Sequence, residues 1–151
     1  MAYIYAVRGW LELSWPDAEI EGVDESAEEH AAKVRRIREV LPSSLPAEEL
    51  DDEDNTSPER VKAGWGWPQH VIGATEYVFY GGDIAHPRVV LDQIREVLAI
   101  DPFADGYFSV EGEDGQRYRQ WIIKSGTVYS RNDLFPDFDA EGAPEGYEVL
   151  K

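Results

Sequence analysis

Alternating apolar and polar positions near the start of the chain predict a first strand over residues 3–15. Leu11 and Leu13 alternate with polar neighbours, whereas Ile4 falls on the opposite parity. The parity changes close to Gly9, and a glycine inside a strand often marks a β-bulge. We therefore expect one long strand with a bulge at this glycine.

Apolar residues spaced by three and four positions predict two long helices. The first begins at a capping box formed by Ser26 and Glu29 and ends before Pro42, which cannot continue a helix. The second has Pro87 in its first turn and ends before Asp101. Both boundaries rest on local chemistry that needs no tertiary contact.

The remaining pattern predicts a short helix and further strands. Ser57 and Pro58 form the start of the short helix, as cap and first helical residue. Gly81-Gly82 closes the strand that precedes the second long helix, and Glu113-Asp114-Gly115 joins the next two strands as a hairpin. The predicted strands are residues 74–80, 107–111, 117–124 and 128–131.

This order, β-α-(α)-β-α-β-β-β, predicts an α+β fold. We expect two layers, with a mostly antiparallel sheet of about five strands packed against two long helices. A chain of 151 residues fits a single domain, residues 1–151. Residues 132–151 are rich in proline, glycine and acids, and we expect them to form an extended acidic C-terminal tail.

The chain carries 31 Asp and Glu against 14 Lys and Arg, which gives a formal net charge of −17. Disordered acidic chains lack apolar residues, but 42% of this chain is hydrophobic, so we expect it to fold. Such a surface repels nucleic acid and anionic membranes and steers a basic protein toward it. The charge therefore favours a basic protein partner.

Two absences narrow the function classes further. There is no cysteine, which excludes disulfides, thiolate metal sites and a cysteine nucleophile. The first residues carry no basic segment followed by an apolar run, and no stretch approaches the ~20 apolar residues of a membrane span. We expect a cytoplasmic protein.

A basic cluster on the first long helix is the one concentration of positive charge that the pattern brings out. It consists of Lys33, Arg35, Arg36 and Arg38. We expect it to be a solvated helix face that pairs with nearby acids.

Asp83 and His86 lie in a glycine-rich turn at a helix start, where an Asp-His pair could act as a general base. The alternative is that both residues cap the helix and satisfy the loop backbone. No nucleophile accompanies them in the sequence. His30, His70 and His86 have no metal-binding spacing, so we expect no metal and no cofactor.

The tail also matches the spacing of a calcium-binding loop. Asp137, Asp139, Glu141, Gly142 and Glu148 occupy positions 1, 3, 5, 6 and 12 of that pattern. The glutamate at the fifth position and a proline inside the loop argue against it. Whether this segment binds calcium stays open at the level of the sequence.

A binding surface is predicted where tryptophans follow an acidic run, because an aromatic anchor with a charged surround is typical of interface hot spots. The alternatives are core packing for at least one tryptophan and a solubilising role for the acids. The first predicted patch is Glu48, Glu49, Asp51, Asp52, Glu53, Trp65 and Trp67, and the second is Asp133, Asp137 and Asp139.

Several short motifs, taken in order, resemble the immunity proteins of bacterial polymorphic toxin systems, and most of all the seventh numbered family of those proteins. They are Gly9-Trp10, Gly81-Gly82-Asp83 with His86, residues 106–115, residues 121–129 and the segment that begins at Asp133. The resemblance covers residues 3–15 and 76–139. The family's tail carries a Ser-Pro-Cys element, which this chain lacks.

The resemblance implies a protein that is not an enzyme. It would bind and neutralise a cognate toxin domain, and the acidic surface favours a basic nuclease as that toxin. Two alternatives remain: a DNA mimic that inhibits a nucleic-acid-binding enzyme, and a hydrolase that uses Asp83 and His86. The sequence does not predict the oligomeric state.

Overall fold

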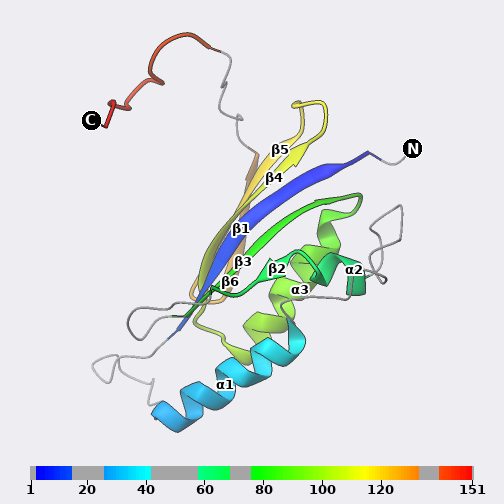
Figure 1. Cartoon of the computed structure of the whole chain (residues 1–151), viewed down its shortest axis with the longest axis vertical. Coiled ribbons are helices and arrows are strands. Elements are labelled where there is room, and N and C mark those ends of the chain that lie inside the picture. Colours follow the sequence, from blue (N-terminus) through cyan, green and yellow to red (C-terminus); the bar gives the residue numbers. More distant parts are fainter. Residues whose placement is uncertain (1–2, 15–25, 42–57, 69–75, 133–139, 151) are drawn as a thin grey trace.

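In the computed structural model, six strands form one open sheet with helices against one of its faces (Figure 1). The structure describes residues 3–14, 26–41, 58–68, 76–132 and 140–150. The sheet order is β2-β3-β1-β4-β5-β6, and every neighbouring pair is antiparallel. The elements are β1 (Tyr5–Leu13), α1 (Ala27–Val40), α2 (Pro58–Lys62), β2 (Trp65–Gly66), β3 (Glu76–Ile84), α3 (Pro87–Ile100), β4 (Asp105–Gly112), β5 (Tyr118–Lys124) and β6 (Thr127–Asn132).

The predicted α+β fold is confirmed, with α1 and α3 as its two long helices. The order differs from the expected one by the two-residue strand β2, which lies at the edge of the sheet beside β3. None of the helices in the described ranges has the length and apolar character needed to cross a membrane.

Both long helices begin and end where their local signals indicate. The Ser26 hydroxyl accepts a hydrogen bond from the backbone N–H of Glu29 at 3.2 Å, which satisfies a donor left open at the start of α1. Pro87 is the first residue of α3, where its missing N–H costs no helical hydrogen bond. Residues at the helix ends therefore set the boundaries of α1 and α3.

β1 runs as one uninterrupted strand, so the bulge that we expected at Gly9 does not form. Its register is constant along both neighbours, and Val7, Leu11 and Leu13 all face the core. Position 9 requires a glycine for a different reason. A Cβ at position 9 would collide with the backbone oxygen of Tyr107 and would lie 2.5 Å from the ring of Phe108, so Gly9 allows β4 to pack closely against β1.

β3 passes through the two glycines at which we expected it to end, and continues to Ile84. Gly81 pairs with Arg8 of β1, and Gly82 pairs with Val7. Strand propensity is weak compared with the hydrogen bonds of a paired neighbour. The central strand β1 therefore extends β3 beyond its local stop signal.

The core lies between the sheet and the helices, with Trp65 near its centre. The indole makes edge contacts with Tyr80 and Phe108, at ring-centroid distances of 5.0 and 5.9 Å. Its N–H donates to Gln93 Oε1 at 2.8 Å, and Gln93 Nε2 donates to the Pro58 carbonyl at 2.9 Å. A buried amide is stabilising when its polar atoms are bonded in this way.

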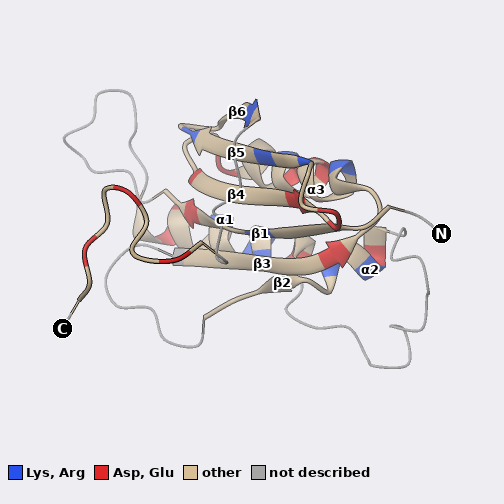
Figure 2. Ribbon diagram, turned by 90° about the horizontal axis from the view of Figure 1, so that it is seen from above, with Lys and Arg blue, Asp and Glu red and all other residues tan. Residues whose placement is uncertain are grey.

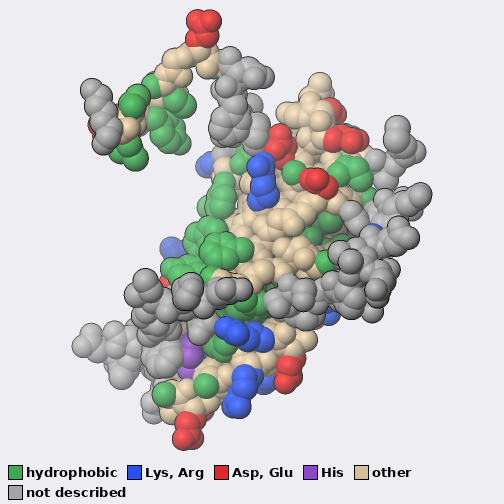
Figure 3. Space-filling model, in the orientation of Figure 1, with side chains coloured by type: hydrophobic (Ala, Val, Ile, Leu, Met, Phe, Trp, Pro, Cys, Tyr) green, Lys and Arg blue, Asp and Glu red, His purple; other side chains and the backbone are tan. Residues whose placement is uncertain are grey.

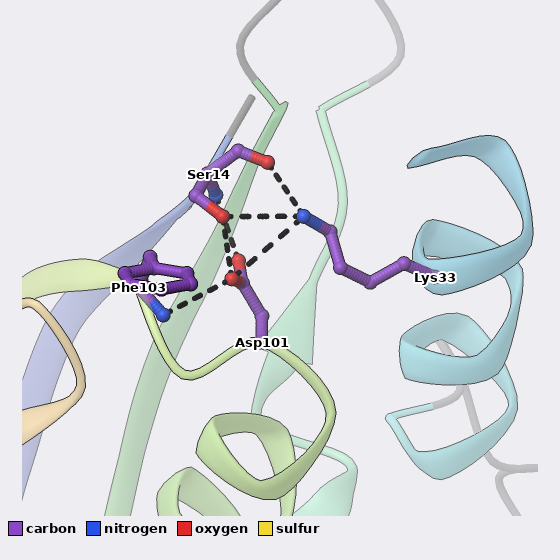
Figure 4. A network of polar contacts seen from close by, with 4 residues as sticks. All are labelled: Ser14, Lys33, Asp101 and Phe103. Carbon is purple, nitrogen blue, oxygen red and sulfur yellow. Dashed lines mark hydrogen bonds and ion pairs between the residues drawn. The ribbon is translucent and has the colours of Figure 1, made fainter. Parts of the chain in front are cut away.

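A buried carboxylate joins the end of β1 to both long helices (Figure 4). Asp101, fully buried at the end of α3, accepts hydrogen bonds from the Ser14 backbone N–H at 2.7 Å and from the Ser14 hydroxyl. Lys33 of α1 lies 3.7 Å from Asp101 and donates to the Ser14 carbonyl at 2.7 Å. The Phe103 N–H adds a further bond, so the buried charge is both paired and hydrogen-bonded.

This network changes the interpretation of the basic cluster on α1. Lys33 lies inside the network, and the Arg38 guanidinium lies 4.7 Å from the centre of the Trp67 ring. Arg35 and Arg36 are exposed. Only part of the cluster is thus the solvated face that we expected.

Candidate binding surface on the helix-free face of the sheet

Successive residues of a strand point to opposite faces, so the sheet divides its side chains into two sets. In β1, Val7 and Leu11 face the helices, whereas Arg8 and Trp10 lie on the other side. We name that other side the helix-free face, because no helix of the described chain packs on it (Figure 1).

One apolar or aromatic residue from each of five adjacent strands aligns across the helix-free face. The register places Trp10 between Phe79 of β3 and Tyr107 of β4. It continues from Tyr107 to Ile122 of β5, and from Ile122 to Tyr129 of β6. These five residues are named the aromatic row. With neighbouring strands about 4.8 Å apart, the row spans roughly 19 Å.

The aromatic row is accessible. Phe79, Ile122 and Tyr129 are 46%, 47% and 57% exposed, and Trp10 is partly exposed between them. Tyr77 extends the apolar surface, because it packs edge-on against Trp10 and stacks with Phe79. Figure 3 shows apolar side chains gathered on the side of the sheet away from the helices. A contiguous exposed apolar patch on a folded domain marks an interaction surface.

Polar residues border the aromatic row on both sides. Glu12 pairs in register with Tyr77, and its negative charge raises the pKa of the Tyr77 hydroxyl. On the other side Arg8 donates to Glu111 at 2.9 Å. An apolar centre with a charged rim is the usual anatomy of a protein–protein interface.

Trp65 does not belong to a binding surface, and its assignment to the first predicted patch is corrected. The β2 register places it opposite Tyr80 on the helix side, where it is only 1% exposed. Trp67 is partly buried, and its indole N–H donates to the Leu41 carbonyl at 2.9 Å. Core packing, the alternative that we considered for the tryptophans, accounts for Trp65.

The acidic residues of both predicted patches lie outside the described residues. These are Glu48, Glu49, Asp51, Asp52, Glu53, Asp133, Asp137 and Asp139. The same holds for the first two positions of the calcium-loop pattern, while Glu141 and Glu148 are exposed. The predicted patches and the calcium loop therefore stay predictions.

The candidate Asp-His pair is divided between two elements. Asp83 lies in β3 on the helix-free face, opposite Ala6. His86 is the exposed N-cap residue of α3, and its side chain forms no capping hydrogen bond. His30 is buried on α1, and the parts of the chain that the structure describes hold no group of three or more His, Asp or Glu side chains placed for a metal.

Our sequence interpretation missed the aromatic row, although each strand carries a signal for it. Tyr107 and Ile122 occupy the outward phase of strands in which the residues on either side of them are buried, and Tyr129 follows the partly buried Val128 in β6. An aromatic or large aliphatic residue in the outward phase is such a signal. That these residues align depends on the strand register, which the pattern alone does not define.

Compared with known proteins, the chain matches no protein-family model, no curated protein and no solved structure. Its function must therefore be inferred from its own residues, and above all from the aromatic row and its charged rim.

Proposed function

We propose that this protein is an inhibitor of the immunity class, which binds a basic toxin domain and neutralises it. The observation that supports this proposal is the aromatic row, a line of large side chains across five paired strands, with three of these side chains exposed and two partly exposed. Such side chains supply most of the binding energy in protein interfaces, and strands hold them with little loss of entropy on binding. The resemblance of the sequence to immunity proteins supplies the class of partner.

The distribution of charge supports a basic partner. Residues 15–25, 42–57 and 133–139 together contain 14 of the 31 Asp and Glu, and no Lys or Arg. Concentrated negative charge raises association rates with a positive partner by ~10–10³-fold, and the effect weakens with salt. In this proposal the aromatic row holds the partner and the acidic segments accelerate its approach.

The helix-free face fits this proposal better than the DNA-mimic alternative. A DNA mimic needs rows of carboxylates at phosphate-like spacing on a rigid face. Here the centre of the rigid face is apolar, and its border mixes both signs, as with Arg8 and Glu111. The hydrolase alternative gains no support from Asp83 and His86, which lie on different elements.

A protection assay tests the proposal. The basic toxin domain encoded beside this gene is expressed in a sensitive host, with the wild-type protein or with the double variant Phe79→Ser/Tyr129→Ser. A matched control, Tyr147→Ser/Leu150→Ser, removes two exposed apolar side chains from the tail instead. We expect protection from the wild type and the control, and loss of protection with the row variant. Absence of protection by the folded wild type overturns the proposal.

A second set of variants separates the acidic segment from the aromatic row. Neutralising Glu48, Glu49, Asp51, Asp52 and Glu53 to the corresponding amides should slow association with the toxin domain and flatten its salt dependence. We expect the dissociation rate to change less, because it depends on the aromatic row. The measurement is surface plasmon resonance at two salt concentrations. A large change in dissociation would instead place these acids in the contact itself.

A further inference from the structure

The helix side of the sheet has a feature that the proposed function does not use. A cavity of about 950 Å³ lies between α3 and the sheet edge formed by β5 and β6. Figure 2 shows Lys and Arg segments on β5, β6 and α3 along this edge. The lining includes Leu91 of α3, Val110 of β4 and Val128 of β6, together with four arginines.

The four arginines come from two walls. Arg88 and Arg95 are seven residues apart on α3, so they share one face of that helix. Arg119 is the second residue of β5, and Arg117 directly precedes that strand. Both pairs line the cavity.

These four arginines form a second basic cluster, besides the one on α1. The described ranges contain 13 Lys and Arg against 17 Asp and Glu. Four of those 13 cations line this cavity, and its described lining residues include no acid. Within the described residues, Arg88, Arg95 and Arg119 form no ion pair and no side-chain hydrogen bond. Like charges held together repel each other, and a bound anion would relieve that repulsion.

Arg117 is held in place before any ligand arrives. Its guanidinium donates to the Tyr5 hydroxyl at 3.2 Å and lies 4.6 Å from the centre of the Tyr3 ring. A guanidinium fixed by a hydrogen bond and an aromatic ring loses less freedom when it binds an anion. Tyr5 also lines the cavity, so the residue that holds Arg117 is itself part of the proposed site.

We propose that this cavity binds a small organic phosphate ester with at least two phosphate groups. Guanidinium groups match phosphate oxygens in paired hydrogen bonds, and two walls with two arginines each suit two phosphates. The apolar lining and the volume, which lies in the usual range of ~300–1,000 Å³ for small-molecule sites, leave room for an organic portion. The proposal stands apart from toxin binding, which uses the other face of the sheet.

A nucleic acid is a less suitable occupant than a small ester. A long polyanion extends past the cavity and meets the net charge of −17. A small ligand lies within the four arginines, and in physiological salt more distant charges are screened over about 8 Å. The local positive charge then dominates its binding.

Isothermal titration calorimetry with ADP and with inorganic pyrophosphate, in salt of about 0.15 M, tests the proposal. We expect saturable binding of one ADP with a dissociation constant below about 1 mM, and weaker binding of pyrophosphate, which lacks an organic portion. Arg88→Gln/Arg95→Gln should weaken ADP binding at least about tenfold, because two charged hydrogen-bond donors are lost. Arg119→Gln, on the opposite wall, should weaken it to a similar degree.

The control is Arg35→Gln/Arg36→Gln, which removes the same charge from exposed positions of α1. We expect it to bind ADP like the wild type, and circular dichroism verifies that every variant is folded. Equal losses in the cavity and control variants overturn the proposal, because the effect is then one of net charge. Absence of saturable ADP binding at about 10 mM overturns it as well. Pyrophosphate that binds as tightly as ADP overturns the assignment to an organic ester.

Discussion

The two faces of the sheet carry similar aromatic side chains in opposite surroundings. On the helix side, Trp65 and Trp121 both contact Phe108 and are almost completely buried. On the helix-free face, Phe79 and Tyr129 are about half exposed. The location of an aromatic residue relative to the helices, rather than its type, therefore separates those that stabilise the fold from those available to a partner.

The largest expected difference between the two faces is in stability. Trp65→Ala should lower the free energy of unfolding by about 3–5 kcal/mol, because it leaves a cavity and deprives Gln93 of its indole partner. Phe79→Ala should lower it by less than about 1 kcal/mol. Urea denaturation of both variants measures this. Equal losses would contradict the division between the faces.

A second prediction concerns the buried carboxylate that joins β1 to the helices. Asp101→Ala should lower the free energy of unfolding by about 2–3 kcal/mol, because the Ser14 N–H and Lys33 lose their acceptor. Asp92→Ala, at an exposed position of the same helix, is the control and should change it by less than about 0.5 kcal/mol. Urea denaturation again provides the measurement, and similar values for the two variants would show that the network adds little.

Substitution of Gly9 in β1 and of Gly81 in β3 compares the two faces directly, because a Cβ at each position would point to a different face. Gly9→Ala should cost about 1–3 kcal/mol, since the new methyl group would meet the Tyr107 backbone oxygen and the Phe108 ring. Gly81→Ala should leave stability unchanged or slightly raised, because nothing lies within 4 Å of the added Cβ. Thermal unfolding monitored by circular dichroism distinguishes the two. A loss at Gly81 as large as at Gly9 would show that the helix-free face is more crowded than described.

The smallest expected effect is a dependence on alkaline pH. Burial raises the pKa of Tyr80, on the helix side, so the folded state favours its neutral form. The unfolded state loses this proton near pH ~10, so the stability contribution is complete below that pH and falls above it, by at most about 1.4 kcal/mol per pH unit. Urea denaturation at pH values around that point should show a shallower fall for Tyr80→Phe than for the wild type. Tyr77→Phe, at a partly exposed position, should behave more like the wild type.

The helices were predictable from sequence because their boundaries depend on local chemistry. Ser26 caps its own helix and Pro87 restricts its own backbone, so neither needs a distant partner. The strands were less predictable, because the extension of β3 past Gly81 depends on a neighbour more than 60 residues away in the chain. The role of Gly9 likewise depends on Tyr107 and Phe108 of the distant strand β4.

The candidate surfaces were harder to predict than the fold. The seven-residue spacing of Arg88 and Arg95 indicates a shared helix face, and the two-residue spacing of Arg117 and Arg119 indicates a shared strand face. Their meeting in one cavity depends on how α3 crosses the sheet, which no local pattern records. The tryptophan pair at residues 65 and 67 stood out in the sequence, yet Trp65 belongs to the core.

The central place of β1 has a consequence for the synthesis of the chain. β1 is translated before β3 and β4, the two strands with which it pairs, and those strands end at Ile84 and Gly112. At ~5–20 residues per second, the ribosome needs several seconds to supply those partners. During that interval β1 carries two unpaired edges, which are prone to aggregate. Residues 15–25, which follow it directly, contain five acids and no Lys or Arg, and such charges next to an apolar strand keep a nascent chain soluble.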